Sequence, residues 1–281
     1  MSEMNARVYR PDSRFATGWL SAVLALYREL MSFRPHIGTL FARDFEAAYR
    51  GAALGVFWNF ALPLVPISAY IMLAGLRVFP AREGLPAAIY ISIGATLWFL
   101  MTGLIRQPIA IVKSRSREVM KTALPLSASI ASSFAMLLFE TLVRLGLVVV
   151  LIVVFRSWPA LTAPLLIPVV IIATTFGLSL GVFLSILNAV SPDIERLVTI
   201  VLQYGIFLSG VIFPVSSLGP IGVLEVANPF AVFITAARDA AFMGGFSHPI
   251  ALAVWSGATL VLALVAARFF YVMEYRIRGL A

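Results

Sequence analysis

Six long apolar stretches constrain the fold of this chain more than any other feature of its sequence. A helix needs about 20 predominantly apolar residues to cross a bilayer, and six segments approach or exceed that length. Of the 281 residues, 61% are hydrophobic and 12% are charged, whereas soluble domains carry about 25% charged residues. We therefore predict an all-α integral membrane protein with six transmembrane helices, at residues 54–76, 88–105, 128–155, 165–190, 197–215 and 249–273.

The distribution of cations predicts the orientation of these spans. Six spans place both termini on one side of the membrane, and sixteen of the 21 Lys and Arg residues fall on that side, against four on the other. Because cationic loops are retained in the cytoplasm, we expect both termini to be cytoplasmic. This topology also explains the net charge of +8, so we expect a lipid bilayer and no nucleic acid as a partner.

The N-terminal segment, residues 1–50, is expected to be distinct from the membrane domain at residues 51–281. Apolar side chains recur in it every four residues, at Ile37, Phe41, Phe45 and Tyr49. Charged side chains occupy the other face, at Arg43, Asp44, Glu46 and Arg50. The pattern predicts an amphipathic helix that lies in the membrane interface. A soluble helical hairpin packed on a partner is the alternative.

The loop between the fifth and sixth predicted spans, residues 216–248, is too apolar for a solvated loop and too broken for two full spans. We predict a pair of short re-entrant helices on the outer side. Non-helical backbone at membrane depth is tolerated only where protein or a water-filled cavity covers it. This segment therefore indicates a pore.

The sequence carries no recognisable catalytic or metal-binding motif. It has no Cys, and its two His residues, His36 and His248, fall on opposite sides of the membrane in the predicted topology. The phosphate-binding pattern Gly-x-x-x-x-Gly-Lys-Ser/Thr is absent. We expect a transport subunit rather than an enzyme, with no cofactor on this chain. If ATP drives transport, another chain must hydrolyse it.

Several side chains are candidates for the lining of a channel. Glu140 and Arg144 lie one turn apart in the third predicted span, where buried charges are costly; they fit either a polar path or a buried structural pair. Aromatic side chains near the membrane edges anchor proteins at the interface, but some could stack on sugar rings. These candidates are Trp58, Trp98, Tyr204, Phe207, Phe213, Phe230 and Phe233.

A ridge of small residues marks the fourth predicted span. Ala173, Gly177, Gly181 and Ser185 recur every four residues, which allows a second helix to approach closely. We favour close packing within the chain over an interface between subunits.

Five cations cluster between Arg106 and Lys121 in the loop between the second and third predicted spans. That loop contains the second of four stretches in a recognisable order, which are RDFEAAYRGAALGVFWNFALPL (43–64), KSRSREVMKTALPLS (113–127), SPDIERLVTIVLQYGIFLSGVIFPVSSL (191–218) and NPFAVFITAARDAAF (228–242). Together they resemble the permease subunits of bacterial ABC-2-type polysaccharide exporters, which include O-antigen, capsule and teichoic-acid exporters. Val119-Met120 and Pro192 depart from the pattern of that family.

The resemblance implies that the basic loop forms a coupling helix that docks on a separate ATPase. The implied coupling residues are Arg115, Arg117, Glu118, Lys121, Leu124, Pro125, Asp193 and Arg196. It also implies a second copy of this chain and two ATPase chains that bind ATP and Mg. The implied substrate is a lipid-linked glycan, exported across the bacterial cytoplasmic membrane. Composition alone would allow a basic loop that only sets topology.

Three other interpretations remain at this stage. An ABC-2-type exporter of a small lipid or a drug would share the topology without the basic N-terminal helix. A secondary transporter or channel would need intramembrane acids for ion coupling, and only Glu140 is available. An integral-membrane enzyme would need His or acidic residues that converge on one face.

Overall fold

The computed structural model describes Arg14, residues 17–49, Ser68, Met72, Leu76, residues 84–119 and residues 125–280. Within these residues the chain is helical and has no strand. Four helices are long and apolar enough to cross a membrane: α4 (Ala87–Val119), α5 (Leu126–Phe155), α6 (Leu166–Val190) and α10 (Pro249–Leu280). The prediction of an all-α integral membrane protein is thus confirmed for the described residues. The first predicted span, 54–76, lies almost wholly outside the described residues.

The helix α4 is the centre of the bundle. Within the chain, 83% of its most apolar window is buried, and it packs against both α5 and α6. The small-residue ridge of α6 makes the contact with α4: a Cβ atom at Gly177 would meet the Met101 carbonyl oxygen at 3.0 Å, and one at Gly181 would collide with the Leu104 carbonyl oxygen. Packing within the chain, the role favoured from the sequence, is confirmed.

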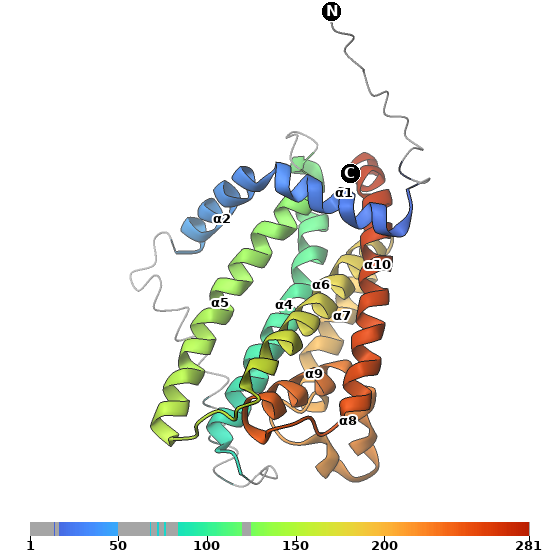
Figure 1. Ribbon diagram of the computed structural model, residues 1–281. Coiled ribbons are helices and arrows are strands. Elements are labelled where there is room, and N and C mark those ends of the chain that lie inside the picture. Colours follow the sequence, from blue (N-terminus) through green and yellow to red (C-terminus); the bar gives the residue numbers. More distant parts are fainter. Residues whose placement is uncertain are drawn as a thin grey trace, which may run out of the picture.

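Two short helices, α1 (Trp19–Ser32) and α2 (Arg34–Tyr49), cross one end of the bundle (Figure 1). The helix α1 packs on α10, and α2 packs on α5 through an edge-to-face contact between Phe45 and Phe139, with ring centroids 5.1 Å apart. The C-terminal end of α10 lies at this same end of the bundle, which we call the proximal end. The placement of α1 and α2 in the membrane interface stays a prediction.

The chain between α6 and α10 departs from the predicted topology. The apolar run 197–215 does not form one span, because α7 (Asp193–Tyr204) passes into a short 3-10 helix, η3 (Gly205–Leu208), and the helix then stops. Gly210 adopts φ +71, a left-handed conformation that glycine tolerates best. The backbone is thus broken where an uninterrupted helix was expected.

A bent pair of helical segments follows this break. The first comprises η4 (Val215–Val223) and α8 (Leu224–Ala227), and the second comprises α9 (Pro229–Arg238) and the π-helical turn η5 (Asp239–Met243). They meet at 95°. Asn228 makes the corner, since its side-chain oxygen accepts the N–H of Phe230 at 3.0 Å and so caps α9. The pair is either a broken span or a re-entrant loop, so the number of spans is four or five among the described residues.

Arg238 is one of the four cations that the predicted topology places on the side opposite the termini, and it has no exposed surface. Its guanidinium donates to the carbonyl oxygens of Tyr90, Gly210 and Val211 at 3.0, 2.6 and 2.9 Å. It also lies 3.5 Å from the centroid of the Tyr90 ring. The break after α7 leaves backbone carbonyls without helical partners. Arg238 donates to those of Gly210 and Val211, and the Tyr90 hydroxyl also donates to that of Gly210 at 3.1 Å. The residue therefore ties α9, the break and the first half of α4 together at the distal end of the bundle, opposite α1 and α2.

Candidate functional site

The proximal end of α4 carries basic residues that the sequence had placed in a loop. The helix α4 is 33 residues long and contains Pro108 without ending there. It continues to Val119, so Arg106 and Lys113 lie on the helix and not in a loop. The basic residues are therefore continuous with a helix that is long and apolar enough to span a membrane.

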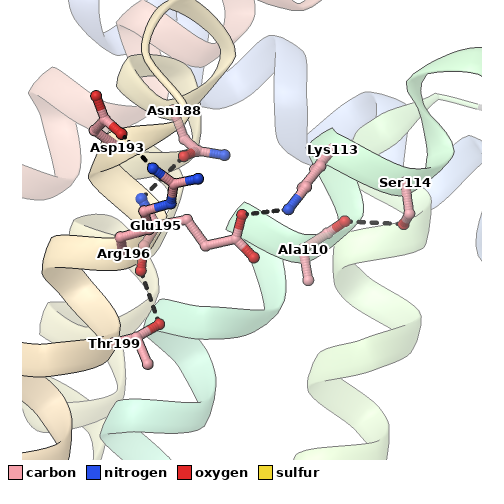
Figure 2. A network of polar contacts seen from close by, with 8 residues as sticks. All are labelled: Ala110, Lys113, Ser114, Asn188, Asp193, Glu195, Arg196 and Thr199. Atoms are coloured by element: carbon pink, nitrogen blue, oxygen red, sulfur yellow. Dashed lines mark hydrogen bonds and ion pairs between the residues drawn. The ribbon is translucent and has the colours of Figure 1, made fainter.

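Lys113 on α4 pairs with Glu195 in the first turn of α7 (Figure 2). The Lys113 Nζ atom lies 2.7 Å from Glu195 Oε2, across 82 positions of sequence. Both side chains retain contact with solvent, with 61% and 35% of their surface exposed. The ion pair joins α4 to α7, the two helices on which Arg115, Arg117, Glu118, Asp193 and Arg196 of the implied coupling residues lie.

The start of α7 is held by further polar contacts, drawn in Figure 2. The buried side chain of Asn188 on α6 accepts the N–H of Glu195 at 3.0 Å, which satisfies one of the free donors at the helix start. Asp193 and Arg196 pair at 3.1 Å on the outside of the same turn. The first turn of α7 is therefore fixed to α6 by Asn188 and to α4 by Lys113. We call the set Lys113, Asn188, Asp193, Glu195 and Arg196 the proximal cluster.

The structure places six of the eight predicted coupling residues. Asp193 and Arg196 belong to the proximal cluster and are 72% and 82% exposed. Pro125 directly precedes α5 in an extended conformation. Arg115, Arg117 and Glu118 lie on the last turns of α4, and Lys121 and Leu124 fall outside the described residues.

The predicted interfacial residues lie on or beside α2. Arg43 and Asp44 pair with each other at 3.1 Å, Tyr49 is the last residue of the helix, and Arg50 falls outside the described residues. The contact of Phe45 with Phe139 shows that the aromatic face of α2 meets α5.

Glu140 and Arg144 form the ion pair that their spacing predicted, with Arg144 Nη2 3.2 Å from Glu140 Oε2. Arg144 is the more buried, with 11% of its side chain exposed against 32% for Glu140. Its guanidinium lies 5.2 Å from the centroid of the Phe99 ring. Within the described part of the chain, its Nε and Nη1 groups have no hydrogen-bond partner. The pair keeps donor capacity for a further group, so both interpretations of it stay open.

The aromatic candidates divide by exposure. Trp98, Phe213 and Phe233 are buried in the core of the chain, and Phe230 packs on Trp98 at 5.1 Å between ring centroids. In this arrangement these four contribute to packing within the chain. Tyr204 and Phe207, by contrast, are 62% and 42% exposed. Trp58 falls outside the described residues.

Sequence reasoning had not selected Glu195 or Asn188, and it had counted Lys113 only as a cation of the loop. A signal for Glu195 exists, because acidic residues in a first helical turn are favourable and the SPDIERL stretch supplies two of them. Among the described residues, no group of three or more His, Asp or Glu side chains could hold a metal ion.

Comparison with known proteins adds two findings. The family model described as "ABC-2 type transporter" matches residues 35–242, which include α4 to α9. The chain is also similar to the O-antigen export system permease protein RfbA of Myxococcus xanthus, with 25% identity over 196 residues, which cover 70% of this chain and 75% of that protein.

Proposed function

This chain belongs to the ABC-2 type transporter family, and we propose that it is the membrane subunit of an ATP-driven exporter for a lipid-linked polysaccharide. In this proposal the substrate is an O-antigen-like glycan that crosses a bacterial cytoplasmic membrane. Two copies of the chain enclose the path, and both termini are cytoplasmic. A separate ATPase, also in two copies, binds ATP and Mg and supplies the energy.

The similarity to an O-antigen export permease carries the substrate class. It extends over most of both chains rather than over a single motif. The exposed aromatic side chains Tyr204 and Phe207 are consistent with a glycan, because sugar rings pack well on aromatic faces, and they lie on the segment that breaks between α7 and η4.

The proximal cluster is our candidate for the surface that contacts the ATPase. Lys113, Asp193 and Arg196 present charges of both signs to solvent, and exposed charges steer association and specify partners. The cluster joins the end of α4 to the start of α7. An ATPase that displaces one of these elements therefore displaces the other.

The connection between α4 and α6 supports a mechanical mechanism. A helix of 33 residues is about 50 Å long, longer than the hydrocarbon core of about 30 Å. Because Gly177 and Gly181 bring α6 against the α4 backbone, the two helices move together. Closure of the ATPase dimer would thus tilt the pair at its proximal end and shift the spans around the path.

Co-purification tests the partnership. A tagged full-length chain in membranes of the source bacterium should recover an ATP-binding chain, and Arg196→Glu should release it by reversing an exposed charge of the proximal cluster. The matched control is Arg156→Glu, an exposed cation at the distal end of α5, which should retain the partner. Recovery of no ATP-binding chain with the unaltered protein would contradict the proposal.

Deletion tests the substrate. Without this chain, surface polysaccharide should disappear and lipid-linked glycan should accumulate in the membrane, as measured by gel staining and lipid extraction. Restoration by the unaltered chain but not by Arg196→Glu would link coupling to export. If surface polysaccharide is unchanged and a small lipid or a drug accumulates in the cell, the substrate class is wrong while the family assignment stands.

A further inference from the structure

An apolar cavity of about 340 Å³ opens among α1, α5, α6 and α10 near the proximal end. Its lining includes Leu26 and Leu30 of α1, Ser127 and Ala131 of α5, and Ala267 and Phe270 of α10. An engineered apolar cavity of about 150 Å³ stays dry and binds benzene. A cavity of more than twice that volume, with walls this apolar, is suited to an alkyl chain and not to water.

The lining of the cavity follows two membrane-spanning helices over several turns. The cavity is lined by one face of α5 from Ser127 to Phe134 and one face of α10 from Ala263 to Phe270, and seven residues of helix extend over about 10 Å. The α5 stretch begins at the proximal end of its helix, and the α10 stretch extends from the middle of α10 toward its proximal end. In a bilayer spanned by these helices, the cavity would lie on the proximal side.

The surroundings of the cavity are themselves suited to lipid. The outward face of α1 is apolar, with Trp19, Leu20 and Tyr27 exposed by 50, 75 and 57%. On α10, Val261 and Phe269 are likewise exposed. Large exposed apolar surfaces of this kind mark contact with a membrane or a partner. Two of the helices that line the cavity, α5 and α10, are long enough to span a membrane.

The proximal end of the cavity is polar. The hydroxyl group of Ser127 is buried, lines the cavity and has no hydrogen-bond partner among the described residues. The adjacent backbone N–H of Leu126 donates to Glu274 at 2.8 Å, and Arg14 lies 3.7 Å from that same carboxylate. A buried hydroxyl without a partner is unusual, and an ester carbonyl of a glycerolipid is an acceptor of the required kind.

We infer that this cavity binds one acyl chain of a phospholipid from the proximal leaflet, with an ester carbonyl accepting the Ser127 hydroxyl. The acyl chain fills the apolar part, the ester reaches the polar end, and the head group lies beyond Arg14. The lipid would join α1 to α5, α6 and α10 and would act as a resident lipid. The inference does not rest on the proposed function.

Photo-labelling of the full-length chain in nanodiscs tests it. The probe is phosphatidylglycerol with a diazirine in the middle of one acyl chain, and labelled peptides are identified by mass spectrometry. We expect labels on residues 127–134 and 263–270, removed by excess unmodified phosphatidylglycerol. Labels confined to the outward positions of α10, or competition by a polyprenyl phosphate but not by phosphatidylglycerol, would overturn the inference.

Variants that fill the cavity provide the second measurement. Ala131→Phe on α5 and Ala267→Phe on α10 each place a ring in the space from a different helix. Each should reduce labelling of the cavity peptides by about tenfold, because several methylene groups lose their burial. Ala258→Phe, at an exposed position of α10 outside the lining, should leave labelling unchanged. Unchanged labelling in both filling variants overturns the inference. If neither variant folds, the competition experiment on the unaltered chain decides it.

Discussion

The helices α4 and α10 are similar in length, yet they occupy opposite environments. Within the chain, 83% of the most apolar window of α4 is buried, against 11% of that of α10. The central helix is nonetheless the least apolar of the four candidate spans. In a membrane protein, the most apolar helix faces lipid, and the helix with small and hydroxyl side chains faces other helices.

The side chains of α4 show the physical reason. Ser92, Thr96 and Thr102 are buried in it, and the two Thr hydroxyls donate to carbonyl oxygens one turn earlier, at 2.7 and 2.8 Å. The two Thr hydroxyls thus satisfy themselves within the helix and leave its surface free for packing. On α10, large aliphatic residues such as Ile250 and Val254 are 80% and 63% exposed.

Among the variants that test this comparison, Arg238→Met is expected to lower the stability of the chain most. Three buried hydrogen bonds from a charged donor, to the carbonyl oxygens of Tyr90, Gly210 and Val211, would be lost. Since a hydrogen bond to a charged group contributes about 1.5–3 kcal/mol, the free energy of unfolding in mixed micelles should fall by about 3 kcal/mol or more. Arg156→Met, at an exposed distal position, should change it little. Equal effects of the two variants would contradict the role assigned to Arg238.

Gly181→Leu should follow in size. Its side chain would collide with the backbone of α4 at Leu104 and Ile105, and overpacking costs about 1–3 kcal/mol or more. The matched control is Gly257→Leu on α10, where an added Cβ meets nothing within 4 Å. We expect thermal unfolding to shift to lower temperature only for the variant on α6. A loss of stability in Gly257→Leu alone would reverse the environments assigned to the two helices.

On α5, whose outward face is largely exposed, Glu140→Gln tests how the chain tolerates a buried charge. It would leave the more buried Arg144 with a charge and no acid at its side. A charge within a span costs about 2.5–3.5 kcal/mol, so this variant should be more destabilising than Arg144→Met, by about 1–2 kcal/mol. The reverse order, measured by chemical denaturation, would show that Glu140 and not Arg144 is the residue that needs its partner.

The smallest effect on stability is expected at the proximal end of α4. Lys113→Glu and Glu195→Lys each break an exposed ion pair, which contributes less than about 1 kcal/mol. The double variant should recover the stability of the unaltered chain. If export depends on the link between α4 and α7, each single variant should lower export and the double variant should restore it in part. Full export in both single variants would show that the pair is dispensable.

The sequence predicted the helices that length and apolar content define, and local chemistry explains some of their ends. Pro125 stands directly before α5, and the Asn228-Pro229 pair starts α9. Both follow from local chemistry, because proline suits the start of a helix and an Asn side chain caps it. The separation of α1 from α2 near Pro35 follows from the same chemistry.

Other features depend on contacts between distant segments and could not be predicted. The apolar run 197–215 has the length of a span, and its break is stabilised by Arg238, which lies 28 residues beyond Gly210. A cation in an otherwise apolar segment suggests exposure when only sequence is considered. The pairing of Lys113 with Glu195 across 82 positions is likewise set by the packing of α4, α6 and α7.

The close approach at three glycines makes the arrangement recognisable in other proteins. A Cβ atom at Gly94 would occupy the space of the Arg238 guanidinium, and those at Gly177 and Gly181 would enter the backbone of α4. A larger residue at Gly94 would displace the Arg238 guanidinium, and one at Gly181 would push α6 away from the backbone of α4. A distant relative that carries a large side chain at the position of Gly181 must therefore hold these two helices further apart, however similar its hydropathy profile.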